Sequence, residues 1–165
     1  MTMSIKQNLR RALGQFPTGV TVMTARKGNE LVGVTASSFN TVSLEPPLIL
    51  WSIDKAAFSA DIFINSDYFT VNVLNESQTD ISNKFASKGA DKFSDVDFEN
   101  GLGNVPLLNH CIANFQCEVW NVHDGGDHYI IIGEVKKYDY SENLKPLVFS
   151  QGQYSSLVPM ATLQN

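Results

Sequence analysis

Two stretches of the sequence change from apolar, strand-like residues into small polar side chains. Val32-Gly33-Val34 leads into Thr35-Ala36-Ser37-Ser38, and Leu48-Ile49-Leu50-Trp51 leads into Ser52-Ile53-Asp54-Lys55. Hydroxyl and backbone N–H groups donate hydrogen bonds to carbonyl or phosphate oxygens, and small side chains let the backbone approach a ligand. The two stretches therefore predict a site for a flat, partly apolar ligand that carries phosphate. A plain polar loop between two strands would use the same residue types.

His128 is the sharpest single candidate for chemistry. It follows Gly125-Gly126-Asp127, a hairpin-type turn signal, and at the mouth of a hairpin its side chain can reach into a cleft. A lone histidine is more often an ordinary surface residue. His123, at the other end of the turn, is expected to be structural.

Other signatures of catalysis are missing from the chain. There is no G-x-S-x-G elbow, no P-loop and no G-x-G-x-x-G after a strand. The spacing of His110, Cys111 and Cys117 matches no zinc pattern, and the alternation of Cys117 with Phe115 and Val119 predicts packing in the core. A chain with so few reactive motifs suits an enzyme whose cofactor does the chemistry.

Length and composition bound the remaining possibilities. A chain of 165 residues, 43% hydrophobic and 18% charged, predicts a single globular domain spanning 1–165. The net charge is −5 without a lysine or arginine cluster, so no nucleic-acid partner is expected. No apolar run is long enough to span a bilayer, so no membrane association is expected. The polar N-terminus has no apolar signal core, which predicts a cytoplasmic location.

The pattern of elements predicts a mainly β fold. A capping box at Ser4-Ile5-Lys6-Gln7 opens a helix whose apolar stripe is Ile5, Leu9 and Leu13. Two further helices are expected at 56–64, with Phe58 on the apolar side, and from a capping signal at 77–80 to about Ser87. Strands are expected at 20–25, 31–35, 48–53, 68–74, 112–123, 129–138 and 147–149. Many short strands with hairpin turns indicate a barrel or sandwich decorated with helices.

The connecting segments are expected to be loops. Residues 39–47 and 88–108 show little periodicity, and 152–165 is expected to be a tail. Long loops in compact domains are usually functional or mobile. The start of the longer loop, flanked by Lys84-Phe85-Ala86 and Asp91-Lys92-Phe93, is either solvated charge with Phe93 packed on the core or a wall over a ligand.

Four motifs in a fixed order resemble the short-chain flavin reductases, the reductase partners of two-component flavin monooxygenases. They are Phe16-Pro17-Thr18-Gly19-Val20-Thr21-Val22, 32–40, 48–55 and Gly125-Gly126-Asp127-His128, and the resemblance extends from about Leu9 to Tyr154. It implies a flavin-binding split β-barrel, FMN or FAD as cofactor, and NADH or NADPH as hydride donor. It also implies a homodimer with the flavin site near the subunit interface, and a separate monooxygenase that receives reduced flavin.

The resemblance also implies the site residues. Flavin contacts are expected at Thr35, Ala36, Ser37, Ser38, Ser52, Ile53, Asp54 and Lys55, with weaker candidates at Ser59, Lys84, Phe85, Ala86 and Tyr154. Lys55 would neutralise phosphate as a point charge, and His128 would contact the nicotinamide dinucleotide.

Two departures from the family pattern bear on phosphate binding. Ala57 stands where the family carries a hydroxyl, and Gln151-Gly152-Gln153-Tyr154 stands where Arg-Gly-Arg-Tyr is frequent. Both changes remove donors or charges for phosphate, so the choice between FMN and FAD is open.

Two rival functions use related features. A non-enzymatic flavin-binding protein or electron carrier on the same barrel would explain the polar strand ends and leave His128 without a role. A split-barrel oxidase acting on a phosphorylated vitamin would concentrate arginines at its site. Only Arg10, Arg11 and Arg26 occur, all early in the chain, which counts against the oxidase.

Overall fold

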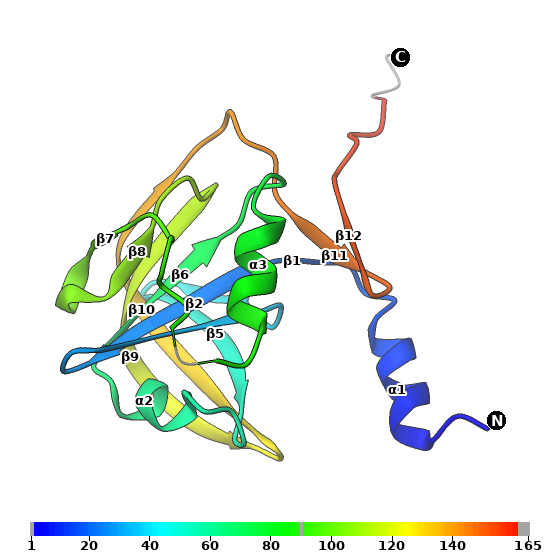
Figure 1. Cartoon of the computed structure of the whole chain (residues 1–165), viewed down its shortest axis with the longest axis horizontal. Helices are drawn as coiled ribbons and strands as arrows, with labels where there is room; N and C mark the ends of the chain where they lie inside the picture. Colours follow the sequence, from blue (N-terminus) through cyan, green and yellow to red (C-terminus); the bar gives the residue numbers. More distant parts are fainter. Residues whose placement is uncertain (1, 90, 162–165) are drawn as a thin grey trace.

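The body of the protein is one seven-stranded antiparallel sheet that curls into a split barrel. The computed structural model describes residues 2–89 and 91–161. The strands follow the order β3-β2-β6-β9-β10-β5-β4 (Figure 1). Their bounds are β2 (Thr21–Lys27), β3 (Glu30–Ala36), β4 (Asn40–Leu44), β5 (Pro47–Asp54), β6 (Tyr68–Val73), β9 (Ala113–Gly125) and β10 (His128–Tyr140). β3 and β4 remain the free edges, and β3 also contacts β5 across the curl. The mainly β split barrel expected from the resemblance is confirmed.

Three helices and two small sheets decorate this barrel. The helices are α1 (Ile5–Leu13), α2 (Ala60–Asn65) and α3 (Thr79–Ala86), with a 3₁₀ turn η1 (Leu102–Asn104). β7 (Phe98–Asn100) pairs with β8 (Pro106–Leu108), and β1 (Thr18–Gly19) pairs with β11 (Val148–Ser150), which also pairs with β12 (Gln153–Ser155). Figure 1 shows α1, β11 and β12 standing beside the barrel as an arm. No helix in the described part of the chain is long and apolar enough to cross a membrane.

Two apolar clusters hold the fold together. The larger lies inside the barrel and includes Trp51, Phe63 and Phe69, with the Trp51 and Phe63 rings edge to face at 4.9 Å between centroids. The smaller lies under α3, where Phe85 packs with Val20, Leu74, Leu108 and Leu147. Phe85 is fully buried, so the end of α3 is fixed against the barrel.

The three segments expected as loops each contain strands. Residues 39–47 include β4, 88–108 include β7, η1 and β8, and 152–165 include β12, while residues 162–165 lie outside the described residues. β4, β7 and β12 are mostly exposed, so they carry no burial periodicity. β8 alternates between buried and half-buried residues, but it is only three residues long.

The start of α1 agrees with the prediction, whereas the starts of α2 and α3 differ from it. α1 has the predicted capping box, because Ser4 Oγ accepts from the N–H of Gln7 and the Gln7 side chain accepts from the N–H of Ser4. α2 begins at Ala60 rather than at residue 56, and Phe58, expected on its buried side, is 85% exposed. α3 has Gln78 as its N-cap without a side-chain capping bond, so the predicted capping signal at 77–80 is wrong.

Candidate functional site

A cavity of about 700 Å³ opens between β3, the turn before α2, the end of α3 and the segment that follows α3. Three of the weaker sequence candidates line it, namely Ser59, Phe85 and Ala86. β3 supplies Leu31 to Val34 as an apolar wall. The cavity therefore joins segments that lie far apart in the chain, from Glu30 to Phe93.

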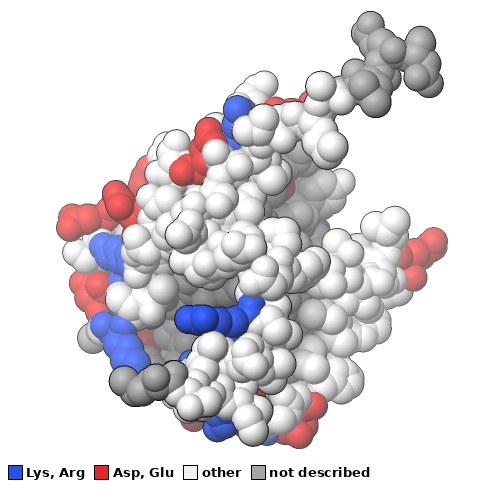
Figure 2. Space-filling model, turned by 90° about the vertical axis from the view of Figure 1, so that its right-hand side faces the viewer, with Lys and Arg blue, Asp and Glu red and all other residues white. Residues whose placement is uncertain are grey.

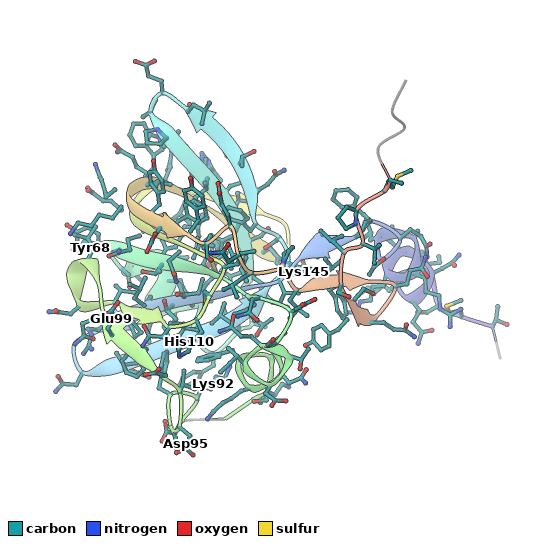
Figure 3. All side chains as sticks on the ribbon, turned by 90° about the horizontal axis from the view of Figure 1, so that it is seen from above. Tyr68, Lys92, Asp95, Glu99, His110 and Lys145 are labelled. Atoms are coloured by element: carbon teal, nitrogen blue, oxygen red, sulfur yellow. The ribbon has the colours of Figure 1, made fainter. Side chains whose placement is uncertain are left out.

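Two cations that were not among the expected site residues, Lys88 and Lys92, line this cavity. The Lys92 ammonium donates to the carbonyl oxygens of Phe85 at 3.1 Å and Gly33 at 3.4 Å. Burial lowers the pKa of Lys92. Figure 3 shows Lys92 beside α3. The following residue, Phe93, packs edge to face on Phe85 at 5.1 Å, which anchors the backbone of Lys92.

Ser59 brings a hydroxyl to the same cavity. The residue is only 8% exposed, and it precedes α2 without making a side-chain capping bond. A buried hydroxyl without a capping partner can bind an oxygen of a ligand. Phe58 stands next to it on the exposed rim.

The hydroxyl groups of the two strand ends bind the protein itself. Thr35 Oγ1 donates to the carbonyl oxygen of Ser82 at 2.7 Å, which ties the end of β3 to α3. Ser38 Oγ donates to the carbonyl oxygen of Ser52 at 3.1 Å and accepts from its N–H at 3.0 Å. The two polar stretches are therefore brought together as expected, with Thr35 and Ser38 serving as the clamps.

The remaining residues of these stretches differ in accessibility. Ser37 and Asp54 are exposed, Ala36 is half-buried, and the side chain of Ile53 is buried in the barrel core. Ile53 therefore offers only its backbone to a ligand at the end of β5.

The β9–β10 hairpin places His128 next to the end of β5. His128 stands opposite Asp54 in the strand register, and its Nδ1 lies 2.6 Å from Asp127 Oδ1. The backbone N–H of Lys55 donates to the carbonyl oxygen of Asp127 at 2.9 Å. The hydrogen bond from His128 lowers the pKa of Asp127. The hairpin thus fixes both the position of His128 and one of its ring nitrogens.

Lys55, expected to neutralise phosphate, has a carboxylate partner in the chain. Its ammonium pairs with Asp124 and lies over the Tyr129 ring, 5.2 Å from the centroid. The hydrogen bond to Asp124 raises the pKa of Lys55, and the same bond lowers the pKa of Asp124. Both residues are solvent-accessible, so a ligand phosphate would compete with Asp124 for this ammonium.

Two further candidates contact α3 or the loop after it rather than lining the cavity. The Tyr154 hydroxyl hydrogen-bonds to Ser82 Oγ and donates to Asn83 Oδ1, both at 2.7 Å. The Lys84 ammonium donates to the carbonyl oxygen of Ser94. Tyr154 thereby links β12 of the arm to the helix whose end lines the cavity.

Comparison with known proteins shows which family shares this sequence. Residues 13–158 match the family described as the flavin reductase like domain. The chain is 39% identical over 158 residues to the reductase subunit HsaB of a flavin-dependent monooxygenase from Mycobacterium tuberculosis, covering 94% of this chain and 84% of the relative. It is also 39% identical over 148 residues to the FMN reductase (NADH) SmoA from Agrobacterium fabrum, covering 90% of this chain and 84% of the relative.

A solved structure agrees with the sequence relatives. The NADH:FAD oxidoreductase SgcE6 from Streptomyces globisporus, in complex with NAD and FAD fragments, superposes with a TM-score of 0.91 at 35% identity. The superposition covers 98% of this chain and 99% of that one. With its split barrel, its polar strand ends and its Gly-Asp-His hairpin, the chain belongs to the flavin reductase-like family.

Proposed function

We propose that this protein is a flavin reductase that oxidises NADH and passes the electrons to FMN or FAD for use by a separate monooxygenase. HsaB is the reductase subunit of a flavin-dependent monooxygenase, SmoA is an FMN reductase that uses NADH, and SgcE6 is an NADH:FAD oxidoreductase, and these relatives support each part of the proposal. The observation that carries it is the meeting of the polar strand ends and the His128 hairpin at the end of β5. The chain runs from there into the cavity that holds the buried Ser59 hydroxyl and the half-buried Lys92.

The donor set of the cavity fits a flavin. Phosphate oxygens accept hydrogen bonds from ammonium and hydroxyl groups, and Lys92 and Ser59 supply one of each. When bound, flavin supplies the chemistry, because it accepts a hydride from reduced nicotinamide. The chain's own task is to hold the two rings together and to place hydrogen-bond donors where negative charge develops on the flavin.

His128 is the residue proposed to contact the dinucleotide. Its Nδ1 faces Asp127, which leaves Nε2 as the ring nitrogen available to a ligand. The contacts of Thr35 to Ser38, Ser52 to Lys55, Lys84 to Ala86 and Tyr154 with flavin stay predictions.

A homodimer is part of the proposal, and the arm supports it. The apolar stripe of α1 is exposed, with Ile5 at 90%, and Phe16 and Val158 are also exposed. The face that carries the arm is mostly uncharged, with one basic side chain near its centre and the other charged side chains along its edges (Figure 2). Large exposed apolar patches usually mark interaction sites, and a second copy that covers this face would bury the stripe.

The dimer is testable with two variants of α1. Leu9→Asp puts a charge on the exposed stripe, whereas Arg11→Asp puts the same charge on the opposite side of the helix. Light scattering is expected to give twice the mass of one chain for the unmodified protein and for Arg11→Asp, and a lower mass for Leu9→Asp. Equal masses for all three would contradict a dimer that uses this stripe.

The cytoplasmic location stays a prediction.

An anaerobic assay tests the reductase function. Purified protein is mixed with excess NADH and excess FAD or FMN, and the loss of the visible absorbance of oxidised flavin is followed. Many flavins reduced per protein are expected, and His128→Ala is expected to raise KM for NADH while leaving flavin affinity unchanged. Reduction of at most one flavin per protein would instead favour the electron-carrier alternative.

A further inference from the structure

The arm that stands beside the barrel is one connected unit (Figure 1). The turn between β11 and β12 is bonded to the end of α1, because the N–H of Gln151 donates to the carbonyl oxygen of Gly14 at 2.9 Å and its side chain donates to Gln15 Oε1 at 3.0 Å. The rings of Phe149 and Tyr154 pack edge to face, with 5.6 Å between their centroids. A shift of α1 would therefore also shift β12 and Tyr154.

One hydroxyl group joins β12 to the rest of the protein. The residues of β12 are all exposed, and in the part of the chain that the structure describes, the side-chain hydrogen bonds of β12 all come from Tyr154. One partner of its hydroxyl, Ser82, is 1% exposed, whereas the other, Asn83, is exposed. Water can replace the bond to Asn83 but not the bond to a buried hydroxyl, so the bond to Ser82 is the one that matters.

Ser82 lies between the arm and the end of β3. Its side chain bonds to Tyr154, while its carbonyl oxygen accepts from Thr35 Oγ1 at 2.7 Å. Thr35 is the first of the strand-end residues expected to contact flavin. Phe85, about one turn further along α3, anchors that helix in the core, and the bonds of Ser82 hold the preceding turn. The arm and an expected flavin contact are therefore joined through one buried serine.

Loss of the Tyr154 hydroxyl would leave the Ser82 hydroxyl buried without this partner. A serine inside a helix can instead donate to the carbonyl oxygen four residues earlier, and such a bond often bends the helix. Here that oxygen belongs to Gln78, which already accepts from the N–H of Ser82 at 3.1 Å. A bend at Ser82 would shift the carbonyl oxygen that holds Thr35, and the end of β3 would then offer a displaced hydroxyl to a ligand.

We propose that Tyr154 is a positioning residue for flavin binding, which holds Ser82 in place so that Ser82 can hold the hydroxyl of Thr35. The inference rests on the proposed reductase function and adds a dependence of flavin affinity on the arm. The arm also carries the exposed stripe of α1. The surface proposed for a second copy and the strand end proposed for flavin are thus connected through one hydroxyl group.

Equilibrium titration with FMN and with FAD, followed by flavin fluorescence, tests the inference. Tyr154→Phe is expected to weaken flavin binding about 2-fold to 30-fold. Ser82→Ala is expected to weaken it by a similar factor, although Ser82 is too buried to touch a flavin. The double variant is expected to bind no more weakly than the weaker single variant, because both changes remove the same hydrogen bond. Tyr140→Phe, at an exposed tyrosine of β10, is expected to change nothing.

Steady-state kinetics separate positioning from a loss of folded protein. Tyr154→Phe is expected to raise KM for flavin and to leave kcat unchanged, because the His128 hairpin makes no hydrogen bond to the arm or to α3 among residues 2–89 and 91–161. The assays are run well below the melting temperature of each variant, and circular dichroism confirms that each is folded. A lower kcat with an unchanged KM would overturn the inference, since it would mean that active protein had been lost.

Two binding results would also overturn it. Weaker flavin binding in Tyr154→Phe but not in Ser82→Ala would mean that the tyrosine contacts flavin directly. Unchanged binding in both variants would mean that the bond only stabilises the fold. In either case NADH-dependent reduction of flavin by the unmodified protein would leave the proposed reductase function standing, and its absence would overturn that function instead.

Discussion

Replacing Tyr154 by phenylalanine removes one hydroxyl that joins the arm to α3. This hydroxyl forms two hydrogen bonds of 2.7 Å, to Ser82 and to Asn83. Ser82 is only 1% exposed, so its hydroxyl would be left without a partner, whereas water can replace the bond to the exposed Asn83. Leaving a buried polar group unsatisfied costs about 1–3 kcal/mol, so we expect Tyr154→Phe to lower the free energy of unfolding by about 2 kcal/mol.

Urea unfolding at a fixed protein concentration measures this loss. The expected result is a lower midpoint with an unchanged slope and a melting temperature lower by about 4–8 °C. Ser82→Ala and the double variant complete a cycle, in which the double variant is expected to lose clearly less stability than the sum of the single variants. Additive losses, or a loss below about 0.5 kcal/mol for Tyr154→Phe, would refute the reasoning that this bond fastens the arm to α3.

Two other predictions concern the close packing at Gly133 and the two cysteines. A Cβ at Gly133 would lie 2.5 Å from Phe69 and 3.0 Å from Cys117, so Gly133→Ala should destabilise by about 1–3 kcal/mol in urea unfolding, whereas Gly19→Ala, with open space, should not. Burial raises the pKa of Cys111 to about 11 and of Cys117 to about 12, from an ordinary 9.0. The fully buried Cys117 thiol should resist a thiol reagent until urea unfolds the chain, and fast labelling of Cys117 in the folded protein would contradict its burial. The unfolded chain loses these protons at lower pH, so the free energy of unfolding should fall as pH rises from 9 toward 11.

Much of the fold follows from local sequence rules, and the missed parts share one physical cause. The capping box of α1 and the β-prone runs of β9 and β10 are readable because the signal lies within the element itself. β4 is exposed along most of its length, and it exists because its backbone pairs with β5. A strand fixed by its neighbour rather than by burial leaves no periodicity to detect.

The site shows the same division. The meeting of the two polar stretches was predictable, because both follow apolar strands and Ser38 bonds to Ser52. The position of Lys92 in the cavity was not predictable from the sequence. It depends on a tertiary contact, the packing of Phe93 against Phe85 and Phe98. Helical spacing placed Phe58 in the core because it could not locate the start of α2 at Ala60.

The most direct test of the account is aerobic oxidation of NADH by the purified protein, followed by the absorbance of reduced nicotinamide, without flavin and with FMN or FAD. The account predicts flavin-dependent turnover far above the rate without protein. It also predicts a smaller kcat/KM for NADH in His128→Ala. No turnover with either flavin, with NADH or with NADPH, would contradict the central claim that this chain is a flavin reductase.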